Sequence, residues 1–269
     1  MNKEILIMLG TGNASVTKCY NTCFAIHAEK EYLLVDTGGG NGILTQLEKA
    51  DIPMEAIHEI IMSHEHTDHI LGLIWLIRMI AAKMKKGLYE GNLNIYCHEQ
   101  LKEIIMTITK LTVQAKFYKM IGERIFIHTV NDGEVRRILG YDIQFFDIRS
   151  TKAKQFGFVM QLKNGKRFTF VGDEPYQEHE RIYAQNTDWL LHEAFCLYRD
   201  RDIFSPYEKH HATVKEACEN AQDLQVVNLI LYHTEDKNIK ERKRLYTEEG
   251  GRYYYGNLLV PDDLDQIVL

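Results

Sequence analysis

Ser63-His64-Glu65-His66-Thr67-Asp68-His69 places three histidines and one aspartate within six positions. The stretch follows the apolar run at residues 57–62 and precedes a long segment with apolar residues at helical spacing. This order predicts a loop that leaves the carboxyl end of a strand and enters a helix. A polar turn that holds histidines by chance is the weaker interpretation of so dense a pattern.

The spacing within this loop is typical of metal ligands. Imidazoles two residues apart in an extended segment point the same way, so His64 and His66 can chelate one ion. Asp68 and His69 lie past the bend, where we expect them to reach a second ion nearby. The loop therefore predicts a metal centre at a strand end.

Composition describes an ordinary globular protein. The chain has 269 residues, of which 45% are hydrophobic and 26% charged, with a net charge of −6. A chain with a negative net charge is poorly suited to bind nucleic acid along many phosphates. Net charge does not exclude a local basic surface, because it says nothing about how the charges are distributed. The basic clusters at residues 83–86 and 237–244 are more typical of charged helix faces. With four prolines and no linker composition, residues 1–269 are expected to form a single domain.

Cysteine usage and targeting signals indicate a cytoplasmic protein. The five cysteines are an odd number without the spacing of a disulfide framework, which suits a reducing compartment. For Cys19 and Cys23, two free thiols are the favoured interpretation, and a zinc-binding or redox pair is the alternative. The N-terminus lacks signal-peptide features. The apolar segment at residues 70–84 contains Arg78 and Lys83, so we expect no membrane span.

Strand and helix patterns alternate along the whole chain. Strands are expected at residues 4–9, 23–28, 32–35, 57–62, 93–96, 124–128, 143–148, 157–162, 167–171, 189–191 and 226–231. Helices are expected at 41–50, 69–86, 100–113, 176–184 and 213–222, with a charged, solvated helix at 238–247 and one helical turn after 260–264. Two sheets packed face to face with helices outside would bury these apolar strands best.

Three further strand ends carry metal-capable side chains. Gly172 lets one strand stop sharply before Asp173, another strand ends in His192-Glu193, and a buried strand delivers His233. Each alone is more typical of a cap or a surface group. Together with the 63–69 loop they supply the remaining ligands of a site for two ions.

These motifs resemble those of the metallo-β-lactamase superfamily, and within it the ribonuclease Z-like phosphodiesterase branch. The resemblance covers nearly the whole chain, through Gly10-Thr11-Gly12, Asp36-Thr37-Gly38, the 64–69 signature, Gly172-Asp173, His192-Glu193-Ala194, His211-Ala212-Thr213 and Tyr232-His233. It implies an α/β fold, a four-layer αββα sandwich of two mixed sheets packed face to face. It places the site at one edge, between the sheets.

The resemblance also implies which residues hold the metal. The implied ligands are His64 and His66 for the first ion, Asp68, His69 and His233 for the second, and Asp173 as a bridge. The implied cofactor is Zn²⁺, as one or two ions, with Mn²⁺ or Fe as alternatives. A water shared by the ions would attack phosphorus or a carbonyl.

Further roles are implied outside the ligand set. Asp68, Glu193 and His211 would be the catalytic residues, the last two as a proton relay to the leaving oxygen. Between the neighbours His210 and His211, the inward-pointing one would be the acid, and we favour His211. Asp36 fits a carboxylate that orients a ligand histidine.

One departure from the family pattern affects the first ion. The family has a further histidine ligand before the strand that opens here at Gly157, but residues 147–154 contain no histidine. Arg149 or Thr151 occupies that position, and arginine has no lone pair to donate. We therefore expect a mainly one-ion centre held by Asp68, His69, Asp173 and His233. Asp147 or water filling the gap is the alternative.

The favoured function is metal-dependent hydrolysis of a phosphodiester, in a small nucleotide-like molecule or a short RNA. The alternatives are hydrolysis of a lactone, thioester or β-lactam, and metal or nucleotide binding with lost turnover. Residues 101–124 lack the Gly/Pro-rich arm that grips tRNA in ribonuclease Z, which argues against tRNA maturation. Residues 253–255, three tyrosines, could form a homodimer contact or pack in the core.

Overall fold

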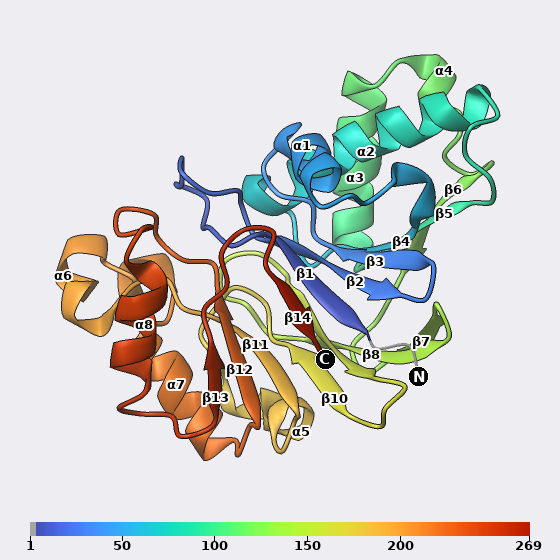
Figure 1. The fold of residues 1–269 in the computed structure, drawn as a ribbon. Coiled ribbons are helices and arrows are strands. Elements are labelled where there is room, and N and C mark those ends of the chain that lie inside the picture. Colours follow the sequence, from blue (N-terminus) through green and yellow to red (C-terminus); the bar gives the residue numbers. More distant parts are fainter. Residues whose placement is uncertain (1–3) are drawn as a thin grey trace. The chain divides into compact units, whose positions relative to one another are not determined.

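The computed structural model, which describes residues 4–269, contains two mixed sheets of seven strands each (Figure 1). Residues 1–3, where the stretch without signal-peptide features begins, lie outside the described residues. The chain divides into two compact units. Unit 1 comprises Met1–Gly10, Tyr20–Asn131 and Leu264–Leu269, and unit 2 comprises Thr11–Cys19 and Asp132–Asp263. A single domain over 1–269 stays a prediction.

The sheet of unit 1 changes from antiparallel to parallel at its centre. Its order is β14 (Gln266–Val268), β1 (Ile5–Gly10), β2 (Cys23–Ala28), β3 (Glu31–Val35), β4 (Ile57–Ile61), β5 (Leu93–Cys97) and β6 (Ile125–Thr129). Strands β3 to β6 run parallel, so their carboxyl ends share one edge of the sheet.

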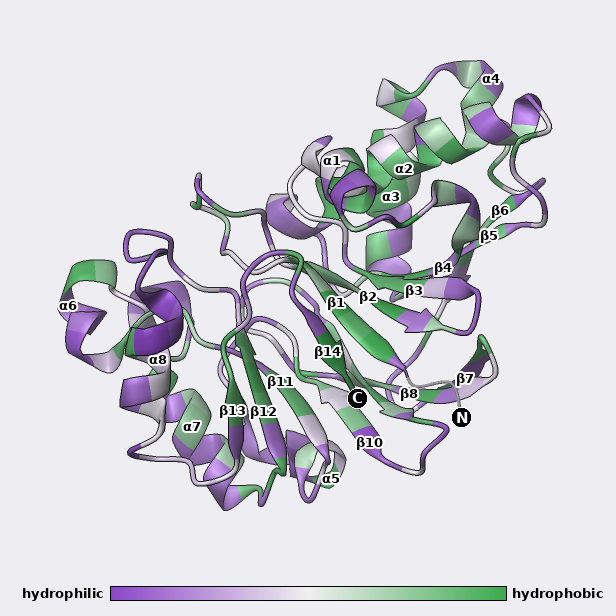
Figure 2. Cartoon of the chain, viewed as in Figure 1, coloured by the Kyte–Doolittle hydropathy of each residue, from purple (hydrophilic) through white to green (hydrophobic). Residues whose placement is uncertain are grey.

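Helices cover the sheet of unit 1 with their apolar faces. They are α1 (Gly42–Lys49), the short turn η1 (Met54–Ala56), α2 (Thr67–Lys85), α3 (Glu99–Thr112) and α4 (Ala115–Tyr118). In α3 the buried residues Leu101, Ile105 and Thr109 recur every fourth position, which turns one face to the core. Figure 2 shows hydrophobic colours along much of α2, in keeping with its many buried aliphatic residues.

The sheet of unit 2 has the same change of direction. Its order is β13 (Asn257–Leu259), β12 (Asn228–Tyr232), β11 (Trp189–Glu193), β10 (Arg167–Phe170), β9 (Phe156–Gln161), β8 (Tyr141–Asp147) and β7 (Val135–Ile138). Strands β10 to β13 are parallel. The helices are α5 (Arg181–Ala184), α6 (Arg201–Phe204), α7 (Val214–Asp223) and α8 (Arg242–Gly250), with single turns η2 (Glu178–Glu180), η3 (Tyr198–Asp200) and η4 (Tyr207–Lys209).

The structure confirms the predicted class of two mixed sheets with helices, and it corrects several elements. The tail holds the strands β13 and β14 instead of a helical turn, and β7 was not predicted. The helix expected at 176–184 is a single turn followed by α5, and the helix expected at 238–247 begins only at Arg242. The missed strands have three or four residues and lie at sheet edges, so their own pattern is weak.

The structure corrects one prediction of solvent exposure, at Arg242, and shows which of the three tyrosines packs in the core. Arg242 was expected on a solvated helix face, but it is fully buried, although most of α8 is hydrophilic in Figure 2. Among the three tyrosines, Tyr254 is buried and its hydroxyl donates to Val226 O, whereas Tyr255 is 80% exposed. A homodimer contact at Tyr255 stays a prediction. Within residues 4–269, no helix combines the length and apolarity needed to cross a membrane.

Candidate metal centre

The first cluster of donors forms because β3 and β4 are parallel neighbours. Val35 pairs with Ile61, so Asp36 and Ser63 follow at the same edge of the sheet. Ser63 donates to Asp36 twice, from its backbone N to Oδ1 at 2.8 Å and from Oγ to Oδ2 at 2.6 Å. The carboxylate of Asp36 is thereby fixed between the two strand ends.

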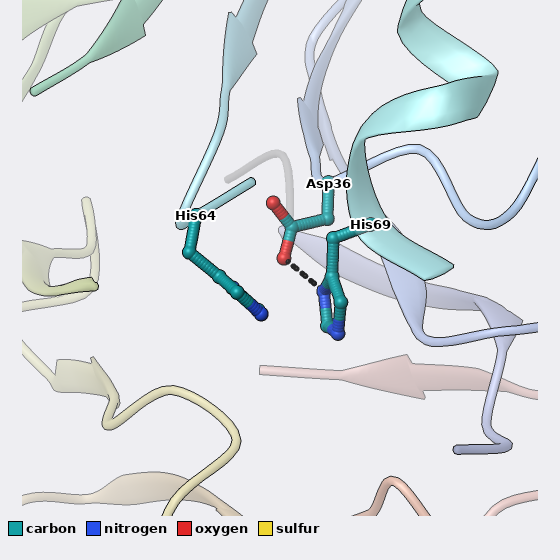
Figure 3. Close-up of side chains that lie close together, drawn as sticks. All are labelled: Asp36, His64 and His69. Carbon is teal, nitrogen blue, oxygen red and sulfur yellow. Dashed lines mark hydrogen bonds and ion pairs between the residues drawn. The ribbon is translucent and has the colours of Figure 1, made fainter. Parts of the chain in front are cut away.

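Asp36 in turn sets the orientation of the histidines. Its Oδ2 lies 2.8 Å from His69 Nδ1 (Figure 3), so His69 donates there and its lone pair is at Nε2. Ser63 Oγ, whose proton goes to Asp36, lies 2.9 Å from His64 Nδ1 and accepts from it. The lone pair of His64 is then also at Nε2, which lies 2.9 Å from His66 Nδ1.

The N-terminal donor group, our name for Asp36, His64, His66, Asp68 and His69, is anchored on the first turn of α2. Asp68 Oδ2 lies 3.4 Å from His69 Nε2. The backbone N and the hydroxyl of Thr37 both donate to the carbonyl of His69, at 3.0 and 2.7 Å. A Cβ on Gly72 would lie 2.0 Å from Thr37 O, so this contact between helix and turn requires glycine.

The second cluster forms by the same rule in unit 2. Asp173 follows β10, Glu193 ends β11 and His233 follows β12, and these three strands are parallel neighbours. His211 joins them because an isolated bridge pairs Cys196 with Thr213, just after β11 and just before α7. We call Asp173, Glu193, His211 and His233 the C-terminal donor group.

Gln155 holds the carboxylate of Asp173 and was missed in the sequence. Its Nε2 donates to Asp173 Oδ1, and its Oε1 accepts from Asp173 N at 3.3 Å. The other oxygen, Oδ2, lies 3.3 Å from His233 Nε2. No sequence signal marks Gln155, because an amide before a strand is ordinary; only the pairing of β9 with β10 gives it this role.

Glu193 and His211 form a buried pair. His211 Nδ1 lies 3.7 Å from Glu193 Oε2, while Glu193 Oε1 accepts from Ala212 N. The His211 ring stacks on Phe195 at 4.7 Å and lies 5.0 Å from the His233 ring. Burial raises the pKa of Glu193 well above its usual value and lowers the pKa of His211 to about 4. Burial thus disfavours the charged form of both groups.

His210 and His192 lie outside this arrangement. His210 is exposed, with a left-handed φ of 56°, and its Nδ1 lies 3.0 Å from Thr151 Oγ1, so His211 is the inward-pointing neighbour. His192 precedes Glu193 on β11 and points the other way. Its Nδ1 lies 2.7 Å from Glu193 O, and burial lowers its pKa to about 4.

The segment that lacks the family's histidine contributes no donor to either group. Ser150 Oγ donates to Glu174 at 2.6 Å, and both Arg149 and Thr151 are exposed. Asp147 accepts from Arg149 N at 2.7 Å. Over residues 4–269, no cluster of three metal-capable donors includes a member of 147–154.

The donor sets have metal-binding chemistry. Donor atoms of Asp36, His64 and His69 lie within 4.8 Å of one another, and so do those of Glu193, His211 and His233. Imidazole nitrogen and carboxylate oxygen are the ligands that Zn²⁺ and similar cations take in proteins. Both units therefore present clusters suited to hold a metal.

Comparisons with known proteins agree with this fold. Ribonuclease Z from Thermococcus sibiricus is 26% identical over 98% of this chain and 96% of its own length. The metallo-β-lactamase fold protein YhfI from Bacillus subtilis has a TM-score of 0.80 at 18% identity, covering 99% of both chains. Zn²⁺-bound PqqB from Methylobacterium extorquens has a TM-score of 0.74 at 12% identity, covering 98% of this chain and 100% of its own.

A family model described as "Anti-Pycsar protein Apyc1" matches residues 5–250. The match spans all strands except β13 and β14, and it includes every member of both donor groups. The metallo-β-lactamase fold and the ribonuclease Z-like motifs agree with it. This chain therefore belongs to the anti-Pycsar protein Apyc1 family, in the ribonuclease Z-like branch of the metallo-β-lactamase superfamily.

Proposed function

We propose that this enzyme, a metal-dependent hydrolase of the ribonuclease Z-like branch, cleaves a phosphodiester in a small nucleotide-like molecule. The observation that carries the proposal is the buried pair of Glu193 and His211 beside His233. A carboxyl group and an imidazole in contact can hold a proton and pass it to a departing oxygen. That help matters most when the leaving group is a poorly acidic alcohol, as in a nucleotide ester.

We propose Zn²⁺ as the metal and residues of both donor groups as its ligands: His64, His66, Asp68, His69, Asp173 and His233. The orientation of each cluster supports this assignment, because the lone pairs of His64 and His69 are at Nε2 and Gln155 leaves Asp173 Oδ2 beside His233. The zinc in PqqB supports the choice of ion. Bound Zn²⁺ would supply Lewis acidity and an activated water.

The one-ion centre also stays our proposal. Without a donor from 147–154, the ion at His64 and His66 would have fewer protein ligands than the ion at Asp68, His69, Asp173 and His233. Arg149 and Thr151 hydrogen-bond within unit 2 through the backbone N and the hydroxyl, respectively. We therefore expect the second ion to bind more tightly.

A pocket beside His211 supports a small substrate. It has a volume of about 240 Å³ and is lined by Thr151, Glu174, Pro175, Tyr176, Gln177, Tyr207, His210 and His211. This is below the roughly 300–1,000 Å³ of sites for drug-sized ligands. One nucleotide unit suits this volume better than a polymer, and the two tyrosines offer aromatic contacts to a base. Short RNA, suggested by the ribonuclease Z relatives, is the second candidate substrate.

The test is a substrate panel with Zn²⁺ or Mn²⁺ supplied. It would contain bis(p-nitrophenyl) phosphate, the p-nitrophenyl ester of thymidine 5′-monophosphate, short RNAs, thioesters, lactones and nitrocefin. We expect the thymidine ester to be cleaved with a higher kcat/KM than the short RNAs. Cleavage of only the thioesters, lactones or nitrocefin would contradict the proposal. Tight nucleotide binding without any product would instead favour a binding protein that has lost turnover.

A further inference from the structure

Arg242, the first residue of α8, is a fully buried cation. Its guanidinium donates four hydrogen bonds within unit 2. Nη1 donates to Thr234 Oγ1 at 2.6 Å and to Thr11 Oγ1 at 3.0 Å, and Nη2 donates to Pro261 O and Asp262 Oδ1, both at 2.9 Å. The guanidinium of Arg242 thus connects three segments that are separate in sequence, at Thr11, at Thr234 and at residues 261–262.

This burial is costly, because a guanidinium loses its hydration when it enters the interior. Asp262, the only carboxylate among the four acceptors, is half exposed, so it neutralises the charge incompletely. In proteins generally, replacement of a buried ion pair by well-packed apolar residues is often neutral or stabilising. Arg242 is therefore better explained by the geometry that it imposes than by its contribution to stability.

The segment that Arg242 holds most closely is the turn after β12. His233 there has a left-handed φ of 58°, a conformation that a residue with a side chain adopts only when its surroundings enforce it. Its neighbour Thr234 is bonded on three sides: its hydroxyl accepts from Arg242, its N donates to Thr11 O at 3.0 Å, and its O accepts from Asn13 N at 3.0 Å.

The other anchor of this network is Thr11. Its backbone N and its hydroxyl donate to Asp263 Oδ1, at 3.0 and 2.8 Å. Because Arg242 Nη1 bonds the hydroxyls of both Thr11 and Thr234, the turn cannot move without breaking contacts to two other segments. The network therefore fixes the residue next to His233 from several directions.

We propose that Arg242 is a positioning residue, which acts through Thr234 to hold the His233 imidazole where it binds the metal. This rests on the proposed function in one respect, the assignment of His233 as a ligand. The four hydrogen bonds of Arg242 go to none of the proposed metal ligands. It does for His233 from a distance what Asp36 does for His69 by direct contact.

The experiment compares Arg242→Lys with Arg244→Lys. Both changes keep the charge and lie in α8, but Arg244 is 56% exposed and pairs with Glu241 and Glu248 of its own helix region. Two readouts are measured: Zn²⁺ affinity by chelator competition, and amide hydrogen exchange of Thr234 in the metal-free protein. For Arg242→Lys we expect Zn²⁺ affinity to fall about 10–100-fold, as for other partners of ligand residues, and Thr234 exchange to accelerate. Arg244→Lys should match the wild type in both.

A second pair of variants covers the case in which Arg242→Lys does not fold. Thr234→Val keeps the shape and the guanidinium but removes one acceptor. Thr247→Val is its control, because Thr247 is exposed and its hydroxyl donates to Lys243 O within α8. We expect Thr234→Val to weaken Zn²⁺ binding by up to about 10-fold. With Co²⁺ in place of Zn²⁺, its visible absorption spectrum should also change.

Wild-type Zn²⁺ affinity in the folded Arg242→Lys or Thr234→Val protein would overturn the proposal, even if the melting temperature fell. Unchanged Thr234 exchange would overturn it independently of any metal. A wild-type protein that binds no Zn²⁺ contradicts the proposed function instead. The metal-free exchange comparison separates these two failures.

Discussion

The two donor groups differ in how the chain builds them. All members of the N-terminal donor group except Asp36 come from residues 64–69, which lead from β4 into the first turn of α2, and Asp36 directly follows the neighbouring strand β3. The C-terminal donor group is gathered from four separate segments, after β10, at the end of β11, before α7 and after β12. Local sequence specifies the first group, whereas long-range contacts specify the second.

This difference has a consequence for mutation. Within the N-terminal donor group, Asp36 and Ser63 orient the histidines by direct hydrogen bonds. Within the C-terminal donor group, orientation depends on Gln155 and on the hydrogen bonds of Thr234, which lie in other segments. Changes far from the donors in sequence should therefore affect the second group more than the first.

Removal of single ligands should give the largest effects. We expect His69→Ala and His233→Ala each to lower kcat/KM by about 1,000-fold or more, because each removes a ligand of the tighter ion. His64→Ala should cost only about 10–100-fold, because its ion has fewer ligands. His27→Ala, which removes a ring stacked on Tyr32, is the control. Steady-state kinetics and metal content measure both effects.

Equal losses from His64→Ala and His69→Ala, with two ions retained per wild-type chain, would break this asymmetry. The centre would then hold both ions tightly despite the missing histidine of residues 147–154. In that case water or Asp147 would have to complete the first ion's ligand shell.

The acid pair should give the next largest effect, and it should depend on the leaving group. Glu193→Gln and His211→Ala should lower kcat by about 100–10,000-fold on an alkyl phosphodiester. They should change cleavage of bis(p-nitrophenyl) phosphate much less, because nitrophenolate leaves without a proton. His210→Ala, at the exposed neighbour, should leave both rates near wild type. Equal losses on both substrates would instead assign the pair to metal binding or folding.

The orienting residues of the two groups should give smaller, comparable effects. Asp36→Asn weakens the acceptor of His69 Nδ1, and Gln155→Leu removes both bonds to Asp173. Each should lower Zn²⁺ affinity by about 10–100-fold in a chelator competition. Gln144→Leu, at a glutamine half-buried on β8, is a control for the second change. Wild-type affinity in Gln155→Leu would mean that other contacts suffice to hold Asp173.

Substitution of Glu180, which lies outside both donor groups, should have the smallest effect on activity but a clear effect on the free energy of unfolding. Burial raises its pKa from 4.5 to about 8. The folded state then holds a proton that the unfolded chain releases above pH 4.5, so this contribution to stability is present below pH 4.5 and is lost as pH rises to about 8. Glu180→Gln should flatten that decline, which is on the order of a few kcal/mol.

Denaturant unfolding at pH 5, 6.5 and 8 measures this dependence. Glu208→Gln, at an exposed position, should retain the wild-type decline. If Glu180→Gln also retained it, the proton of Glu180 would not be linked to folding.

The sequence predicted those site residues that a local pattern marks. The 63–69 loop, Asp173 and His233 were predicted because each follows an apolar strand, and the structure places all of them at strand ends. Gln155 and Arg242 were not predicted, because their roles arise only from partners 18 and 8 or more residues away, respectively. Arg242 was even assigned to a solvated helix face, because a helix rich in lysine and arginine is normally exposed to solvent.

The edge strands were missed for a related reason. In β7 only Ile138 is buried, and the exposed Val135, Arg136 and Arg137 give no apolar alternation. Such a strand forms because β8 offers it a partner, and no property of its own sequence reveals this.

The central proposal is that residues of both donor groups are the ligands of Zn²⁺. Anomalous diffraction at the zinc edge, from crystals grown with Zn²⁺, tests it directly. We expect a peak about 2.0–2.1 Å from nitrogens of both His69 and His233, with carboxylate oxygens of Asp68 and Asp173 beside it. Zinc held by only one donor group, or at any other position, would contradict the account.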